Sequence, residues 1–300
     1  MTRYEAMPGP TDSLTDIAGL QVGNAHDEKV RSGVTVVLPD TPVTMGVDVR
    51  GGGPGTRDTE ALDPTCLVEK MHGLVLSGGS VFGLAAADGV ASFLSHKGIG
   101  LPISPAAVPV VPAAILFDLR NGGDKNWGTE PPYRALGIAA AEDASDTMTA
   151  GRTGAGYGAT AGAYSGGLGT ASLVLPNGLM VAAIVAVNSF GGPVVRTAAE
   201  HGVVEMPKMG ISGTNTTIAA VATNAPLNKA ECTRFAMMAQ DGLARALRPI
   251  HTPFDGDTVF ALSTADCETD LEAGTLMALL GTLGSDCIVR AIEKAIAATN

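Results

Sequence analysis

Residues 213–227 read GTNTTIAAVATNAPL, a polar turn that runs directly into an apolar segment. Gly, Asn and Thr are typical of turns because they tolerate unusual backbone angles or hydrogen-bond their own backbone. The following residues, 217–223, are small or β-branched and favour a strand that is buried on both faces. The stretch therefore predicts a core strand that begins at about Thr216, with a hydroxyl at its first position.

An Asn carbonyl followed by a Thr hydroxyl at a strand start is what a self-cleaving N-terminal-nucleophile hydrolase requires. The Thr216 Oγ attacks the carbonyl carbon of Asn215, the acyl group moves from nitrogen to oxygen, and water releases a chain that begins with Thr216. The new α-amine, with an ordinary pKa of about 7.7 to 8.0, can act as the general base. Asn-Thr-Thr before a strand is also ordinary turn sequence, so the rest of the chain must decide.

Composition limits the class of protein. The chain has 300 residues, of which 45% are hydrophobic and 16% charged, so we expect one large domain over 1–300. Its formal charge of −11, without a basic run, argues against a nucleic-acid or membrane partner. The first 16 residues lack a signal-peptide pattern, and the apolar stretch 179–187 is too short to span a bilayer, so we expect a cytoplasmic location.

No motif predicts a cofactor or a metal. The four cysteines form no CxxC pair and have no histidine at ligand spacing, which argues against a zinc site or a disulfide framework. Residues 154–159 fit G-x-G-x-x-A, but no strand precedes them and the next acidic residue is Glu200, so a dinucleotide site is not expected.

The apolar pattern predicts a mixture of helices and strands. Asn177-Gly178 favours a hairpin, and Asn228 with Glu231 forms a capping-box pattern before a helix. This arrangement predicts an α+β layered sandwich with helices outside and sheets within. The expected strands are 34–38, 44–48, 74–76, 171–175, 179–187, one that follows Thr216, and 258–262, and the expected helices are 81–97, 133–146, 229–247 and 271–298.

Two carboxylates flank a glycine at the entrance to one of these strands. Asp255 and Asp257 would repel each other unless a cation or hydrogen-bond donors lie between them. The alternative is that both are solvated turn residues. The neighbouring His251 is interpreted as structural.

Seven blocks of the chain together resemble the DmpA-type aminopeptidase family, which includes β-aminopeptidases and the 6-aminohexanoate-oligomer (nylon-oligomer) hydrolases. The resemblance implies an αββα sandwich similar to N-terminal-nucleophile hydrolases, hydrolysis of a small peptide-like or oligoamide substrate, self-cleavage into 1–215 and 216–300, and a homotetramer of the cleaved units. The Asn-Thr-Thr form is most similar to the nylon-oligomer branch. The blocks are TDIAGLQVGNA (15–25), RGGGPGTRDTEALDP (50–64), LSGGSVFGLAAADGV (76–90), GGLGTASL (166–173), VAVNSFG (185–191), NTTIAAVATNAPL (215–227) and HTPFDGDTVFAL (251–262).

The resemblance also assigns roles to individual residues. It implies that Thr216, after Asn215, is the nucleophile and that Asn188 donates to the developing oxyanion. Asp255 and Asp257 match the pair around the nucleophile's amine. We interpret Asp257 as orienting the amine, while Asp255 supports it or holds a substrate ammonium.

Two positions depart from the family pattern. Ala163 stands where a Lys is expected, and Phe117 stands where a Tyr is expected. These departures leave open whether activity is altered. Alternatives are therefore an aminopeptidase for β-peptides or D-amino-acid amides, or a catalytically silent binding relative.

Overall fold

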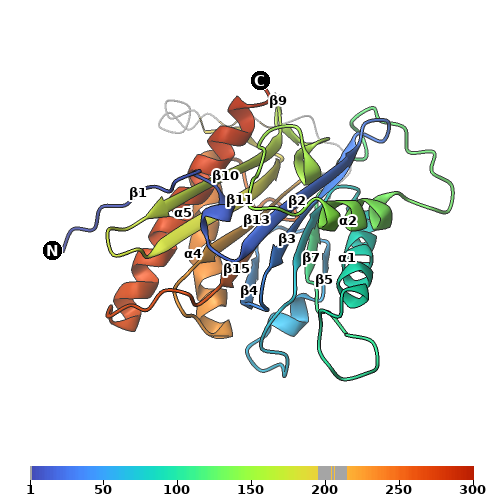
Figure 1. The fold of residues 1–300 in the computed structure, drawn as a ribbon. Helices are drawn as coiled ribbons and strands as arrows, with labels where there is room; N and C mark the ends of the chain where they lie inside the picture. The colour runs from blue at the N-terminus through green and yellow to red at the C-terminus, as the bar shows by residue number, and fades with distance from the viewer. Residues whose placement is uncertain (1, 195–203, 205, 207–214) are drawn as a thin grey trace.

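Two β-sheets lie face to face between two pairs of helices in a computed structural model that describes residues 2–194, 204, 206 and 215–300 (Figure 1). The six-stranded sheet has the order β1-β10-β11-β13-β15-β4, and the five-stranded sheet has the order β2-β3-β6-β7-β5. The first sheet comprises β1 (Met7–Pro8), β10 (Gly167–Val174), β11 (Met180–Asn188), β13 (Thr216–Thr223), β15 (Thr258–Ser263) and β4 (Thr44–Val49). The second comprises β2 (Leu20–Asp27), β3 (Ser32–Pro39), β6 (Leu74–Ser77), β7 (Ala113–Ile115) and β5 (Thr56–Arg57).

The helices cover the outer faces of the sheets. Helices α4 (Lys229–Ala246) and α5 (Ala273–Ala297) pack on the six-stranded sheet, while α1 (Ala85–His96) and α2 (Tyr133–Glu142) pack on the five-stranded sheet. Four short 3₁₀ turns and two small two-stranded sheets complete the secondary structure of the described residues. They are η1 (Leu14–Asp16), η2 (Thr59–Leu62), η3 (Ser80–Leu84), η4 (Gly154–Gly156), β8 (Thr160–Ala161) with β9 (Tyr164–Ser165), and β12 (Gly192–Pro193) with β14 (Leu247–Arg248).

Strand β13 lies in the core and is buried on both faces. Successive side chains of a strand point to opposite faces. Ala219 and Val221 accordingly pack against α4 and α5, whereas Ile218 and Ala220 pack between the two sheets. Its apolar sequence therefore reflects burial on both sides and confirms the αββα sandwich.

Several local predictions are confirmed. The β10–β11 hairpin turns at Asn177-Gly178, where Gly178 has φ of 83°. The capping box of α4 forms: Glu231 N donates to Asn228 Oδ1 at 3.0 Å, and Asn228 N donates to Glu231 Oε2 at 2.8 Å. The start of the expected 81–97 helix is wrong, because 80–84 form a 3₁₀ turn that leaves Phe82 43% exposed. The second helix ends at Glu142, four residues before its predicted end.

Helix α5 is the one described helix whose length and apolar composition would suffice to cross a membrane. Half of its most apolar window is buried inside the protein, where it packs on the six-stranded sheet and α4. This packing accounts for its apolar character.

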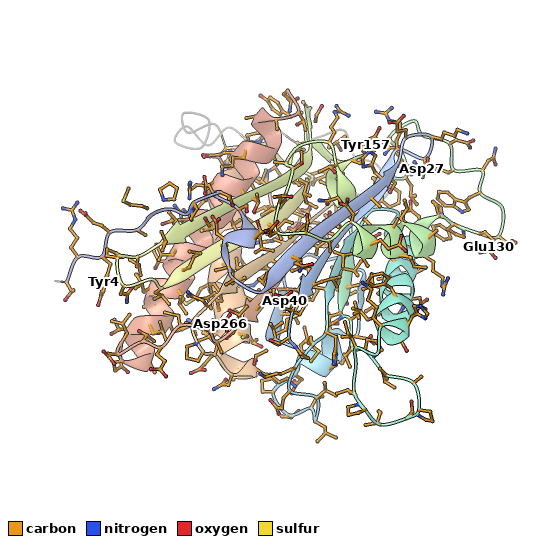
Figure 2. All side chains as sticks on the ribbon, in the orientation of Figure 1. Tyr4, Asp27, Asp40, Glu130, Tyr157 and Asp266 are labelled. Carbon is orange, nitrogen blue, oxygen red and sulfur yellow. The ribbon has the colours of Figure 1, made fainter. Side chains whose placement is uncertain are left out.

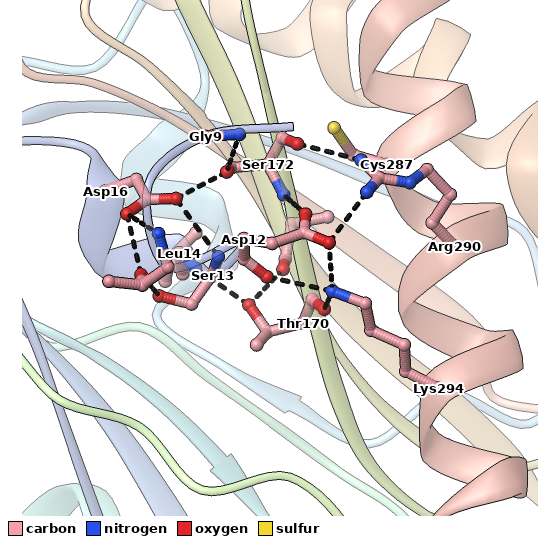
Figure 3. A network of polar contacts seen from close by, with 12 residues as sticks. Gly9, Asp12, Ser13, Leu14, Asp16, Thr170, Ser172, Cys287, Arg290 and Lys294 are labelled. Atoms are coloured by element: carbon pink, nitrogen blue, oxygen red, sulfur yellow. Dashed lines mark hydrogen bonds and ion pairs between the residues drawn. The ribbon is translucent and has the colours of Figure 1, made fainter. Parts of the chain in front are cut away.

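Polar contacts fasten the segment before η1 to α5 and β10 (Figure 3). The Asp12 carboxylate accepts from Arg290 Nη2 at 2.7 Å, from Lys294 Nζ at 2.5 Å and from Ser172 N at 2.9 Å. Asp16 accepts from Ser172 Oγ at 2.5 Å. Two positions near the N-terminus are thereby joined to one strand, β10, and one helix, α5, that are far away in the sequence.

Candidate active site

Strand pairing brings the predicted site residues together at one end of β11 and β13. Asn188, the last residue of β11, pairs with Thr216, the first residue of β13. Asn215 forms an isolated bridge with Asp255, just before β15. The sheet therefore gathers three segments that are far apart in the sequence.

Thr216 is 2% exposed, and its hydroxyl has two backbone neighbours. The Oγ donates to the Asn215 carbonyl oxygen in a short hydrogen bond and accepts from Gly256 N at 3.1 Å. A Cβ on Gly256 would come within 2.7 Å of that Oγ, so only glycine allows this approach. Residues 213 and 214 of the predicted turn lie outside the described residues.

Asn188 is held by two backbone groups. Its Oδ1 accepts from Thr160 N at 3.0 Å, and its Nδ2 donates to the Phe117 carbonyl at 2.9 Å. Because an amide NH₂ carries two hydrogens, one further donor remains on Nδ2. The backbone of Phe117 therefore lies beside Asn188.

Asp257 links strand β13 to His251. Its Oδ1 accepts from Thr217 N at 2.8 Å, and its Oδ2 accepts from His251 N at 3.0 Å and lies 2.9 Å from His251 Nδ1. The Asp257 side chain is fully buried, whereas that of His251 is 21% exposed. Sequence reasoning gave His251 a structural role only; the sole available signal was its place six residues before Asp257.

Asp255 is also fully buried, and its oxygens are occupied by the protein itself. Oδ1 accepts from Phe190 N at 3.1 Å, and Oδ2 accepts from Thr252 N at 2.9 Å and from Thr252 Oγ at 2.6 Å. Burial, followed by the charge of Asp257, raises the pKa of Asp255 above its usual value of 3.8. These contacts favour the supporting role over capture of a substrate ammonium, and neither aspartate is a solvated turn residue.

A glycine-rich loop supports the two aspartates from behind. Gly53 N donates to the Asp255 carbonyl at 2.7 Å, and Arg50 N donates to the Asp257 carbonyl at 2.9 Å. A Cβ on Gly51 would overlap with the Asp255 carbonyl oxygen and Asp257 N. The block 50–55 is therefore part of the site's framework, a role that sequence reasoning did not assign.

Within the described ranges, no group of three or more His, Cys, Asp or Glu side chains could hold a metal ion. The site instead combines a buried hydroxyl, an anchored amide and two buried carboxylates. This set can support acyl transfer to Thr216.

Comparisons with known proteins show which proteins this chain is similar to. The model of peptidase family S58 matches residues 12–300. An uncharacterized aminopeptidase of Mycobacterium leprae is 40% identical over 97% of this chain and 92% of its own length. A 6-aminohexanoate-oligomer endohydrolase of Kocuria sp. is 29% identical over 87% of this chain and 77% of its own length.

Solved structures share the fold. The L-aminopeptidase D-Ala-esterase/amidase of Ochrobactrum anthropi, reported as a variant of the Ntn hydrolase fold, has a TM-score of 0.76 at 20% identity, covering 99% of this chain and 89% of its own. A Burkholderia sp. β-aminopeptidase has a TM-score of 0.73 at 22% identity, covering 99% and 90%. At such identities the likeness concerns the fold alone.

Proposed function

The chain belongs to peptidase family S58 and is an amide hydrolase. We propose that it matures by cutting itself between Asn215 and Thr216. The observation that carries the proposal is the buried Thr216 hydroxyl, which lies against the Asn215 carbonyl and receives the Gly256 amide. The domain 1–300 would then consist of an α chain, 1–215, and a β chain, 216–300.

Turnover would use the same hydroxyl on a peptide-like or ω-amino-acid amide bond. The Thr216 amine takes the hydroxyl proton while Oγ attacks the substrate carbonyl carbon, and the free Nδ2–H of Asn188 stabilises the oxyanion. The C–N bond breaks as the leaving amine takes the proton. Water then attacks the acyl ester, releases the acid and restores the Thr216 hydroxyl.

Asp257 has the geometry to orient the amine. It holds the amide of Thr217, the residue next to the nucleophile, and is itself held by His251. A carboxylate there raises an amine's pKa, so its benefit is orientation and stabilisation of the ammonium that forms during attack. Asp255 keeps the 252–256 turn in place beneath it.

Two substrate classes follow from the relatives. The 29% identical relatives are named for 6-aminohexanoate oligomers, which favours linear ω-amino-acid amides. The 40% identical relative is named an aminopeptidase, which supports an aminopeptidase as the second candidate. For that candidate we propose β-peptides or D-amino-acid amides as substrates. We propose that the cleaved units assemble as a homotetramer, which light scattering would test.

Intact-mass analysis tests maturation. We expect fragments of roughly 21.6 and 8.6 kDa, from each fragment's share of the residues in the 30.2 kDa chain, with the smaller fragment starting at Thr216. Thr216→Val should remain one inactive chain.

Thr217→Val is the matched control, because it makes the same change one residue later. It should still be cut before Thr216. A wild-type chain that stays at 30.2 kDa would instead favour the catalytically silent binding relative, and a smaller fragment that starts at Thr217 would show that the nucleophile is assigned one residue too early.

A further inference from the structure

A pocket of about 280 Å³ lies beside the candidate active site. It is formed by the turn between β2 and β3 and by the segment that carries β8 and β9. Asp27 and Tyr157, labelled in Figure 2, lie near each other at the meeting of these two segments, where His26 and Tyr157 stack at 4.1 Å. Its described lining includes Arg31, Arg152, Thr160, Gly162, Ala163 and Ser165.

The pocket adjoins Asn188 through the β8–β9 hairpin. Thr160, one of its lining residues, donates its backbone N–H to Asn188 Oδ1 at 3.0 Å. Gly162, another, donates its N–H to the Ser189 carbonyl at 3.2 Å. The pocket therefore lies next to the segment that carries Asn188, the proposed oxyanion donor.

The described lining of the pocket is positively charged. Arg31 and Arg152 are both exposed, and neither has an acidic side chain within ion-pair distance among the residues that the structure places. Arg152 Nη2 donates to Ser165 Oγ at 2.8 Å, which fixes one edge of its guanidinium group. Ala163, another lining residue, adds only a single methyl group to the pocket.

We propose that this Arg31–Arg152 pocket binds the free carboxylate of the leaving-group half of the substrate, an inference that rests on the proposed function. Guanidinium groups pair well with carboxylates because both are planar and can form two parallel hydrogen bonds. The acyl half of an aminopeptidase substrate ends in an ammonium, which the two arginines would repel. The carboxylate must therefore belong to the amine product, and the enzyme should prefer substrates cut one unit before a free acid.

Matched acid and carboxamide substrates test this preference. The 6-aminohexanoate dimer and β-alanyl-β-alanine would each be supplied as the free acid and as the C-terminal carboxamide. We expect the wild-type kcat/KM for the acid to exceed that for the carboxamide by about five- to tenfold, as for two partly exposed charge pairs. The preference should shrink as salt rises toward about 1 M, because salt screens exposed charges.

The Arg31→Gln/Arg152→Gln double variant should lose the preference, whereas the control Arg234→Gln, which removes one arginine charge at an exposed position on α4, should keep it. Equal wild-type rates for acid and carboxamide, or a preference that does not respond to salt, would overturn the inference and leave the proposed function standing. A wild-type enzyme that cleaves none of the four compounds would overturn the proposed substrate classes, and the inference with them.

Discussion

Thr216 and Thr217 are chemically identical neighbours with different surroundings. Because side chains alternate along β13, their hydroxyls point to opposite faces. Thr216 Oγ receives the Gly256 amide, whereas Thr217 Oγ is buried without a hydrogen-bond partner among the described residues. The Asn-Thr pattern and the family resemblance predicted Thr216 as the nucleophile. They could not predict that the Thr216 hydroxyl, and not that of Thr217, meets the Asp255–Asp257 turn, because that depends on which face of β13 lies against the turn.

Asn188 should matter for rate more than for stability. If its free N–H donates to the oxyanion, Asn188→Ala should lower turnover by about 10² to 10³, as is typical for loss of one such donor. Steady-state kinetics and urea unfolding of the same preparation separate the two effects.

Asn224→Ala is a matched control, because Asn224 also accepts one backbone N–H, at 2.8 Å, and donates to one carbonyl, at 2.9 Å. Asn224 lies just after the opposite end of β13. Similar losses of stability and similar turnover in the two variants would mean that Asn188 is purely structural.

Among the secondary-structure elements, the sequence predicted those turns and helix ends that depend on neighbouring residues. The Asn177-Gly178 hairpin and the Asn228–Glu231 capping box depend on residues a few positions apart, so they could be predicted. The glycine loop at 50–55 lies against 255–257 only after the sheets form, and nothing local signals that contact. The contact between His251 and Asp257 could not be predicted either, because from the sequence alone His251 could not be distinguished from an ordinary structural histidine.

A buried carboxyl beside the five-stranded sheet offers a pH-dependent test. Asp118 Oδ1 accepts from Gly79 N at 2.8 Å, but its Oδ2 has no hydrogen-bond partner among the described residues. Burial raises the pKa of Asp118 above 3.8, and the nearby Ser32, Gly79 and Lys125 offset this only in part. The fold therefore disfavours the ionised form of Asp118. The resulting loss of folding stability is absent below pH 3.8 and develops as the pH rises through the raised pKa.

Asp118→Asn should stabilise the protein at neutral pH. The amide keeps the shape and the bond from Gly79 while removing the buried charge, so we expect a gain of about 1 to 3 kcal/mol at pH 7 that disappears toward about pH 4. Urea unfolding in the uncut Thr216→Val background would measure it on a single chain. The control is Asp40→Asn, because Asp40 is exposed (Figure 2) and its substitution reports the effect of losing a surface charge. An equal gain in stability at pH 7 and at about pH 4 would contradict the raised pKa of Asp118.

At the scale of the whole molecule, the proposed cleavage would leave two chains that share one core. Strand β13 pairs with β11 on one side and with β15 on the other, so the six-stranded sheet would contain strands of both fragments. The Asp12 contacts also cross between them, because Asp12 lies in 1–215 while Arg290 and Lys294 lie in 216–300 (Figure 3). The sequence gives no sign of this connection, which joins positions 278 and 282 residues apart.

Removing the Asp12 charge should therefore loosen the cleaved protein. Asp12→Asn loses the charge that two cations share, which we expect to cost about 1 to 3 kcal/mol, and it should release the small fragment at a lower urea concentration. Release should depend on protein concentration, because two chains separate. In the uncut Thr216→Val background, the same substitution should still destabilise the fold but without any concentration dependence. The control is Asp286→Asn, whose 2.6 Å pair with Arg245 lies wholly within 216–300. If Asp286→Asn releases the fragment as readily as Asp12→Asn, the Asp12 contacts do not hold the two chains together.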